Sequence, residues 1–146
     1  MWESYDKALF LNFSFVICEG TRAGNNLAGQ IPTEISHLVK LQILDLQNNK
    51  ISGTIPNSFG DLKELRDFTI NRNRVFGTIP ESLFQAISLK NLELRTNSFS
   101  GSLSSMFGQL TSLRRVVLDG NNFSNRIPSE FGKLTQLSKS LILTIL

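Results

Sequence analysis

The feature that most constrains the fold of this 146-residue chain is a period of 24 residues. A leucine recurs at this spacing from Leu41 to Leu137, and an asparagine recurs in the same way from Asn49 to Asn121. A period of about 20 to 50 residues is typical of solenoids, in which neighbouring copies share one continuous core. We therefore expect a partial copy at 21–40, full copies at 41–64, 65–88, 89–112 and 113–136, and an incomplete copy at 137–146.

Each copy begins with a segment that alternates between apolar and polar residues. The first, fourth and sixth places are apolar, as in Leu41, Leu44 and Leu46. Alternation at the fourth and sixth places predicts a short strand with one buried face. When the copies stack, these strands form a parallel sheet with neighbours about 4.8 Å apart.

The asparagine at the ninth place follows this strand on the inward side. A buried side-chain amide can bond backbone groups that no strand ladder reaches. We therefore predict a structural role for the asparagines at this place, which are Asn49, Asn73, Asn97 and Asn121.

Departures from the repeat predict local changes. Phe84 stands where other copies have glycine, and Ala86 stands where they have leucine, so copy 65–88 should be repacked. Ser104 replaces the proline of other copies. Ser140 occupies an apolar place, so the last copy should slip, and its apolar end is typical of a truncated or alternatively ended chain.

Residues 1–20 do not share the period. A polar start is followed by an apolar stretch from Ala8 to Cys18. This stretch is either the core of a secretory signal or a cap strand or flank that covers the first coil. Glu3 and Asp6 argue against a signal, because its leading region should be positive. The stretch is also shorter than the roughly 20 apolar residues of a membrane span.

Composition excludes several classes of function. The net charge of +3 permits acidic partners but is too small to indicate nucleic-acid binding. Cys18 is the only cysteine and His37 the only histidine, so neither an internal disulfide nor a zinc site of the usual ligand count is expected. Motifs for an activated serine, a zinc helix, a phosphate loop or a dinucleotide site are missing. We expect a protein without enzymatic activity and without a cofactor.

The repeat resembles the plant-type leucine-rich repeat, Leu-x-x-Leu-x-Leu-x-x-Asn-x-Leu-Ser-Gly-x-Ile-Pro-x-x-Leu-Gly-x-Leu-x-x. The likeness covers residues 25–137 and is clearest in Ile51-Ser52-Gly53 and Ile55-Pro56. It implies an α/β solenoid, namely a right-handed leucine-rich-repeat superhelix with a concave parallel β-sheet. It also implies a convex side of 3-10, short helical or irregular segments, and a second short strand near each Gly-x-Ile-Pro.

The resemblance further implies a class of function. Its members include ectodomains of plant receptor-like kinases and receptor-like proteins, and secreted inhibitors of fungal pectin-degrading enzymes. We therefore predict a non-enzymatic module for protein or peptide recognition, from a plant cell-surface receptor or co-receptor in signalling, located outside the cell or at its surface. Another leucine-rich-repeat ectodomain is a possible partner. The alternative is a secreted inhibitor or cell-wall protein that binds an acidic polysaccharide or its hydrolase.

The candidate ligand-binding residues are those that point outward from the concave strands. They occupy the third, fifth, seventh and eighth places and vary between copies, as a recognition surface would, although solubility and drift alone give the same pattern. The predicted residues are Asp45, Gln47, Asp67, Thr69, Asn71, Arg72, Asn91, Glu93, Arg95, Arg115 and Asp119.

Further signals concern charge and glycosylation. Arg66, Lys90 and Arg114 stack at the second place, as a solvated face or as a site for an acidic partner. The run 72–74 is similar to the paired arginines with which some plant peptide-hormone receptors hold a carboxylate, but here the two arginines flank the structural asparagine. Asn122 begins an Asn-x-Ser glycosylation motif, and a second one begins at Asn12.

Overall fold

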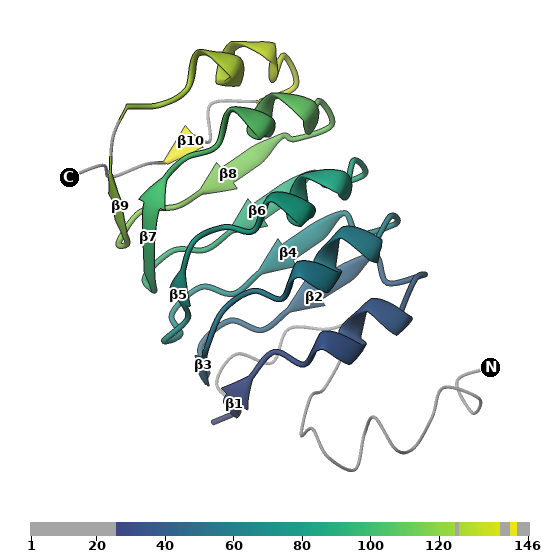
Figure 1. Ribbon diagram of the computed structural model, residues 1–146, viewed down its shortest axis with the longest axis vertical. Helices are drawn as coiled ribbons and strands as arrows, with labels where there is room; N and C mark the ends of the chain where they lie inside the picture. The colour runs from purple at the N-terminus through teal and green to yellow at the C-terminus, as the bar shows by residue number, and fades with distance from the viewer. Residues whose placement is uncertain (1–25, 125, 138–140, 143–146) are drawn as a thin grey trace.

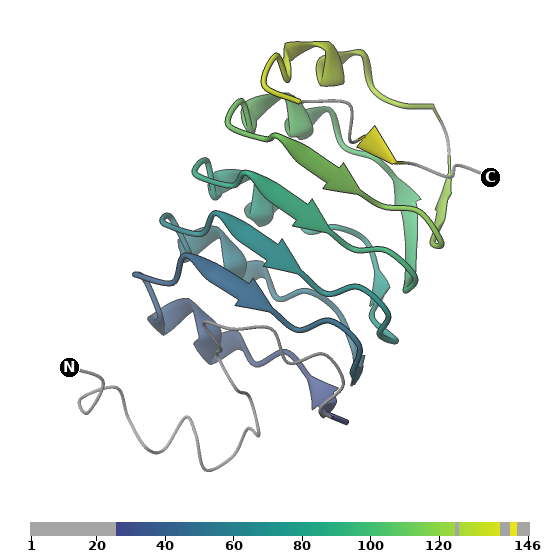
Figure 2. The same ribbon diagram turned by 180° about the vertical axis from the view of Figure 1, so that it is seen from behind.

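The computed structural model describes residues 26–124, 126–137 and 141–142, which form a stack of coils (Figure 1). One strand of each full coil joins a five-stranded parallel sheet, here called the main sheet, in the order β10-β8-β6-β4-β2. Its strands are β2 (Ile43–Asp45), β4 (Asp67–Thr69), β6 (Asn91–Glu93), β8 (Arg115–Val117) and β10 (Leu141–Ile142). Figure 2 shows this sheet from its outward side. The predicted leucine-rich-repeat fold with parallel strands is confirmed.

A second set of short strands follows the main strands along each coil. These are β1 (Ala28–Gln30), β3 (Lys50–Ser52), β5 (Phe76–Gly77), β7 (Ser98–Ser102) and β9 (Asn122–Ser124). β1 pairs with β3, and β7 pairs with both β5 and β9, all in parallel. The N–H groups of Arg74 and Phe76 donate to the carbonyls of Ile51 and Gly53 at 2.8 and 2.9 Å, so backbone bonding continues from β3 to β5. We call these strands together the second sheet.

Short 3-10 helices complete the coils on the side opposite the main sheet (Figures 1 and 2). They are η1 (Thr33–His37), η2 (Asn57–Asp61), η3 (Glu81–Gln85), η4 (Ser105–Gln109) and η5 (Ser129–Lys133). A proline precedes each of them except η4, with φ between −73° and −58° and ψ between 140° and 147°. Ser104 takes that place with φ −75° and ψ 143°, close to the −65° and 145° of Pro56. Its hydroxyl also accepts the Met106 N–H at 3.1 Å and so caps η4.

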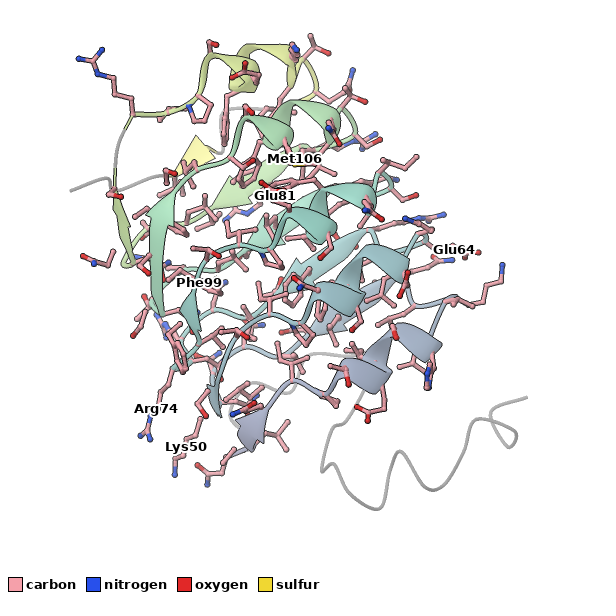
Figure 3. The ribbon with its side chains drawn as sticks, in the orientation of Figure 1. Lys50, Glu64, Arg74, Glu81, Phe99 and Met106 are labelled. Carbon is pink, nitrogen blue, oxygen red and sulfur yellow. The ribbon has the colours of Figure 1, made fainter. Side chains whose placement is uncertain are left out.

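One apolar core runs the length of the stack. The inward residues of the main strands, such as Phe68 and Leu92, are fully buried beneath the helices. Phe99 lies inward from the second sheet (labelled in Figure 3), and its ring stacks on Phe123 with centroids 6.2 Å apart. Copy 65–88 is packed differently, as predicted. The ring of Phe84 meets Phe107 edge-on at 4.8 Å, and both Phe84 and Ala86 are fully buried.

The last main strand is shifted by one residue. Leu92 pairs with Val116, a spacing of 24 (116 − 92), but Val116 pairs with Leu141, a spacing of 25 (141 − 116). The shift brings Leu141, and not the polar Ser140, to the register position of an inward residue.

Several predictions fall outside the described residues. They concern the flank 1–20 with Cys18 and the motif at Asn12, as well as Ser140 itself. Within the described part of the chain, none of the helices is long and apolar enough to span a bilayer.

Candidate ligand-binding surface

Half-buried asparagine amides tie the two sheets together in each of the four full coils. Asn73 accepts the Ile51 N–H at 2.9 Å and donates to the carbonyls of Leu46 and Ile70 at 2.9 and 3.1 Å. Asn97 donates to the same Ile70 carbonyl at 2.9 Å. Each amide therefore serves its own coil and the one before it. Asn49 and Asn121 bond the equivalent groups of their coils, so the turn between the sheets has the same shape throughout.

The residue before each of these asparagines has a left-handed backbone. Its φ is 56° at Asn48, 55° at Arg72, 53° at Thr96 and 67° at Gly120. Asparagine and glycine tolerate this region, but an ordinary residue adopts it at a cost, and a β-branched threonine is an outlier there. The repeat pattern groups this eighth place with the unconstrained surface places. The presence of Asn48 and Gly120 at this place indicates, from the sequence alone, that the backbone restricts which residues fit the eighth place.

The predicted ligand-binding residues lie on the outward face of the main sheet, where most of them bond one another across coils. Glu93 is the centre of this network. One carboxylate oxygen accepts from the side chain of Asn71 at 2.8 Å, and the other contacts Nε of Arg115 at 2.6 Å. The side-chain oxygen of Asn71 accepts the backbone N–H of Arg95 at 2.8 Å. Arg95 in turn forms an ion pair with Asp119 at 2.9 Å.

Further hydrogen bonds between side chains lie on the same face closer to β2. Asp67 accepts a hydrogen bond from the side-chain amide of Asn91. Asp45 accepts two hydrogen bonds from Gln47, one from its backbone N–H at 3.0 Å and one from its side chain at 2.9 Å. Thr69 lies half-buried among these residues. The main sheet therefore displays fixed donors and acceptors, held by contacts that repeat-level reasoning does not show.

The exposure of the outward residues changes along the main sheet. Ile43, at an outward place on β2, is 47% exposed. Val117 occupies an outward place on β8 but is only 2% exposed, so this part of the face is closed to solvent. One oxygen of the neighbouring Asp119 is buried and has no hydrogen-bond partner. The outward residues of these strands therefore become less exposed from β2, through the half-buried positions of β4 and β6, to β8.

The basic residues at the second place lie along the rim where the main strands begin. Arg66 is exposed, whereas Lys90 is half-buried. Glu64 (Figure 3) lies on the same rim and contacts Lys40 at 2.6 Å. The hydrogen bond from Lys40 lowers the pKa of Glu64, and the charge of Arg66 contributes a smaller decrease. The carboxylate of Glu64 therefore balances part of the positive charge along this rim.

Other predicted residues lie away from the main sheet. His37 is exposed in η1, and Asn122 is exposed on β9 together with Ser124 of its glycosylation motif. Among the described residues there is no group of three or more His, Cys, Asp or Glu side chains that could hold a metal ion.

Solved structures with this architecture include plant receptor ectodomains. The ectodomain of the Arabidopsis thaliana receptor kinase GASSHO1/SCHENGEN3, solved with CASPARIAN STRIP INTEGRITY FACTOR 2, is 33% identical, with a TM-score of 0.77 over 81% of this chain. The Arabidopsis receptor kinase HAESA, solved with the peptide hormone IDA and the co-receptor SERK1, is 32% identical, with a TM-score of 0.76 over 84%. The matched chain of the BIR3–SERK2 complex from Arabidopsis thaliana is 33% identical, with a TM-score of 0.71 over 80% of this chain.

The chain is short beside these proteins. It spans 14% of the GASSHO1/SCHENGEN3 chain, 20% of the HAESA chain and 67% of the matched chain of the BIR3–SERK2 complex. A comparison with curated proteins gives no match. Family models described as leucine-rich repeat match residues 24–75, 88–110 and 112–134. The chain therefore belongs to the leucine-rich repeat family, in its plant-type form.

Proposed function

We propose that this chain is a non-enzymatic recognition module of a plant cell-surface receptor or co-receptor, and that the outward face of the main sheet binds a peptide or another leucine-rich-repeat ectodomain. The observation that carries the proposal is the network around Glu93, whose members differ from coil to coil although the frame beneath them repeats. The similar ectodomains support it, because HAESA was solved with the peptide hormone IDA and the co-receptor SERK1.

The network suits recognition because its side chains are already fixed. Immobilising a long side chain on binding costs about 0.5–1.5 kcal/mol, and cross-coil bonds meet part of that cost in advance. The side chains of Arg95 and Arg115 remain 53% and 41% exposed while they hold their carboxylate partners. A peptide laid across β4 and β6 would therefore meet oriented guanidinium donors beside carboxylate and amide acceptors.

A charge-swapped pair tests the proposal. Glu93→Arg combined with Arg115→Glu retains an ion pair but reverses its direction on the surface. Random 12-residue peptides displayed on phage are selected on the wild-type chain, and their affinities are then measured by calorimetry. We expect the swap to weaken the selected peptides about tenfold or more. The unfolding midpoint should fall only slightly, because the Asn71 amide that loses its acceptor is only half-buried.

The matched control is Glu81→Arg, an exposed position in η3 on the opposite side of the molecule (Figure 3). It should leave the same peptides unaffected. Peptides that bind the swapped variant as tightly as the wild type would overturn the proposal, and so would a selection that yields no binder.

The proposed location is the cell surface or the extracellular space, and Asn122 offers a test of it. Asn122 and Ser124 are both exposed, so an oligosaccharide could be attached without disturbing the core. When the chain is expressed in plant cells with a secretion signal, glycosidase treatment should lower its mass, and Asn122→Gln should abolish the difference. A secreted wild-type chain that carries no glycan would contradict this assignment.

The second candidate function is binding of an acidic wall polysaccharide or of its hydrolase. The rim residues Arg66 and Lys90, one coil apart, favour it. Because exposed charges are screened by salt, polygalacturonate binding should then fall steeply between low and physiological ionic strength. Binding that does not depend on salt would count against this candidate.

A further inference from the structure

The outward face of the second sheet has its own chemistry, which the main sheet does not explain. In each copy the eleventh place points inward and is buried, as at Ile51 and Val75. The tenth, twelfth and fourteenth places point outward. Across the described coils from β3 to β9, these outward residues are Lys, Arg, Phe, Asn, Ser or Thr, and none of them carries a carboxylate. This face therefore lacks the acidic residues that balance the main sheet.

Its cations gather at the corner where β3 and β5 begin. Lys50 and Arg74 occupy the same place in adjacent coils and are both exposed. Figure 3 shows their side chains extending side by side away from the body of the molecule. No ion pair joins either of them to a described residue, and like charges one strand spacing apart repel each other. The charges of Lys50 and Arg74 therefore do not stabilise the fold.

Arg72 adds a third cation beside the same corner, also at a cost. It is exposed, and its φ of 55° lies in the region that favours asparagine or glycine. The equivalent residues Asn48 and Gly120 suit that backbone. No hydrogen bond or ion pair within the described part of the chain holds the Arg72 guanidinium, so its side chain does not offset the strain.

An exposed aromatic ring lies next to these cations. Phe76 is 51% exposed on β5, at a place that is serine in the other full copies, for example Ser52 and Ser100. Serine satisfies the fold at this place, so the ring is not needed for packing. Phe76 is two residues beyond Arg74 on the same side of the chain, which separates the two by about 7 Å. A cation and an apolar anchor are thus presented together.

We propose that Lys50, Arg72, Arg74 and Phe76, here called the basic–aromatic corner, form a second binding surface for an acidic peptide segment of a protein partner. In an extended peptide, alternate side chains also lie about 7 Å apart on one face. A carboxylate and an apolar side chain two residues apart in the partner would therefore meet Arg74 and Phe76 together. Arg72 is also a candidate residue of the main face, but Lys50, Arg74 and Phe76 are not. Variants of these three residues therefore test the inference independently of the proposed function.

The probe is a fluorescent 12-residue peptide made of three Glu-Ser-Leu-Ser repeats, which presents Glu and Leu alternately on one face. The same peptide with Lys in place of Glu, and one with Ser in place of Leu, serve as controls. We expect only the Glu/Leu peptide to bind the wild-type chain. Phe76→Ser should weaken it about fivefold through lost apolar burial. Arg74→Gln should weaken it about threefold and reduce the dependence of the affinity on salt.

Arg72→Asn separates binding from folding. It should raise the melting temperature, because asparagine fits the left-handed backbone, and it should weaken the Glu/Leu peptide. Thr96→Asn, at the same place one coil later, should raise the melting temperature without affecting the peptide.

Three outcomes would overturn the inference. The first is that the Glu/Leu peptide does not bind the wild-type chain. The second is that it binds Phe76→Ser as well as the wild type. The third is that polygalacturonate binds at the corner more tightly than the peptide and regardless of Phe76, which would make the surface a polysaccharide site.

Discussion

The asparagines of successive coils should be energetically coupled, because they share backbone acceptors. The Ile70 carbonyl accepts from the side chain of Asn73 at 3.1 Å and from that of Asn97 at 2.9 Å, and these are its only hydrogen bonds among the described residues. Replacing one asparagine by leucine leaves this carbonyl bonded. Replacing both leaves it buried without a donor.

The expected magnitude follows from the groups that each change leaves unpaired. Asn97→Leu deprives the Val75 N–H of its acceptor, and Asn73→Leu does the same to Ile51. An unpaired buried donor costs about 2 kcal/mol, so each single variant should lose about that much stability. Each sixth-place carbonyl that loses a donor keeps another, from the asparagine of its own coil or of the next one. The double variant should lose about 4 kcal/mol, plus a coupling of about 1–2 kcal/mol for the stripped Ile70 carbonyl.

Urea unfolding followed by circular dichroism, with calorimetry as the second probe, gives the four free energies of this cycle. The control cycle pairs Asn49 with Asn97, whose amides donate to different carbonyls. Its two effects should add to within about 0.5 kcal/mol. If the cycle of Asn73 and Asn97 shows no larger coupling than this control, the shared-acceptor explanation is wrong.

Three smaller predictions concern single positions. Thr96→Asn should stabilise the fold by about 1 kcal/mol by relieving the left-handed strain, and a lower calorimetric melting temperature would refute this. The pKa of Glu64, measured by NMR titration, should lie below 4.5 and should rise in Lys40→Met. Because folding lowers this pKa, the ion pair stabilises the folded chain above about pH 4.5. That contribution disappears as the pH falls through the folded pKa. Ser104→Pro should change stability by less than about 0.5 kcal/mol, because loss of the helix cap is offset by a stiffer unfolded chain; a larger shift in urea midpoint would contradict that balance.

Those parts of the fold that depend on one residue type in every coil were predictable from the sequence. Apolar residues such as Leu44 and Phe68 alternate with polar ones because the strand has one buried face, and the period carries that pattern from coil to coil. The asparagine amide could be placed in the same way. Its position after an inward strand leaves backbone groups that need a partner, and Asn73 bonds such groups.

The contacts between outward side chains could not be predicted in that way. Whether Glu93 bonds Arg115 or a closer neighbour depends on rotamers, and the 24-residue pattern does not restrict them. The register of β10 depends on where the last coil absorbs one extra residue. Phe76 was visible as a departure from serine, but its proximity to Lys50 and Arg74 appears only when the coils are stacked.

At the eighth place the needs of the frame and of the surface are opposed, and this makes Arg72 more informative than its neighbours. Most substitutions on a binding surface are ambiguous, because a loss of binding can follow from a loss of structure. Here asparagine should improve the backbone and remove a cation at the same time. Stability and binding would then change in opposite directions, and no general destabilisation of the coil produces that result. If Arg72→Asn instead lowered both, the guanidinium would have a structural role, and the case for its functional role would be lost.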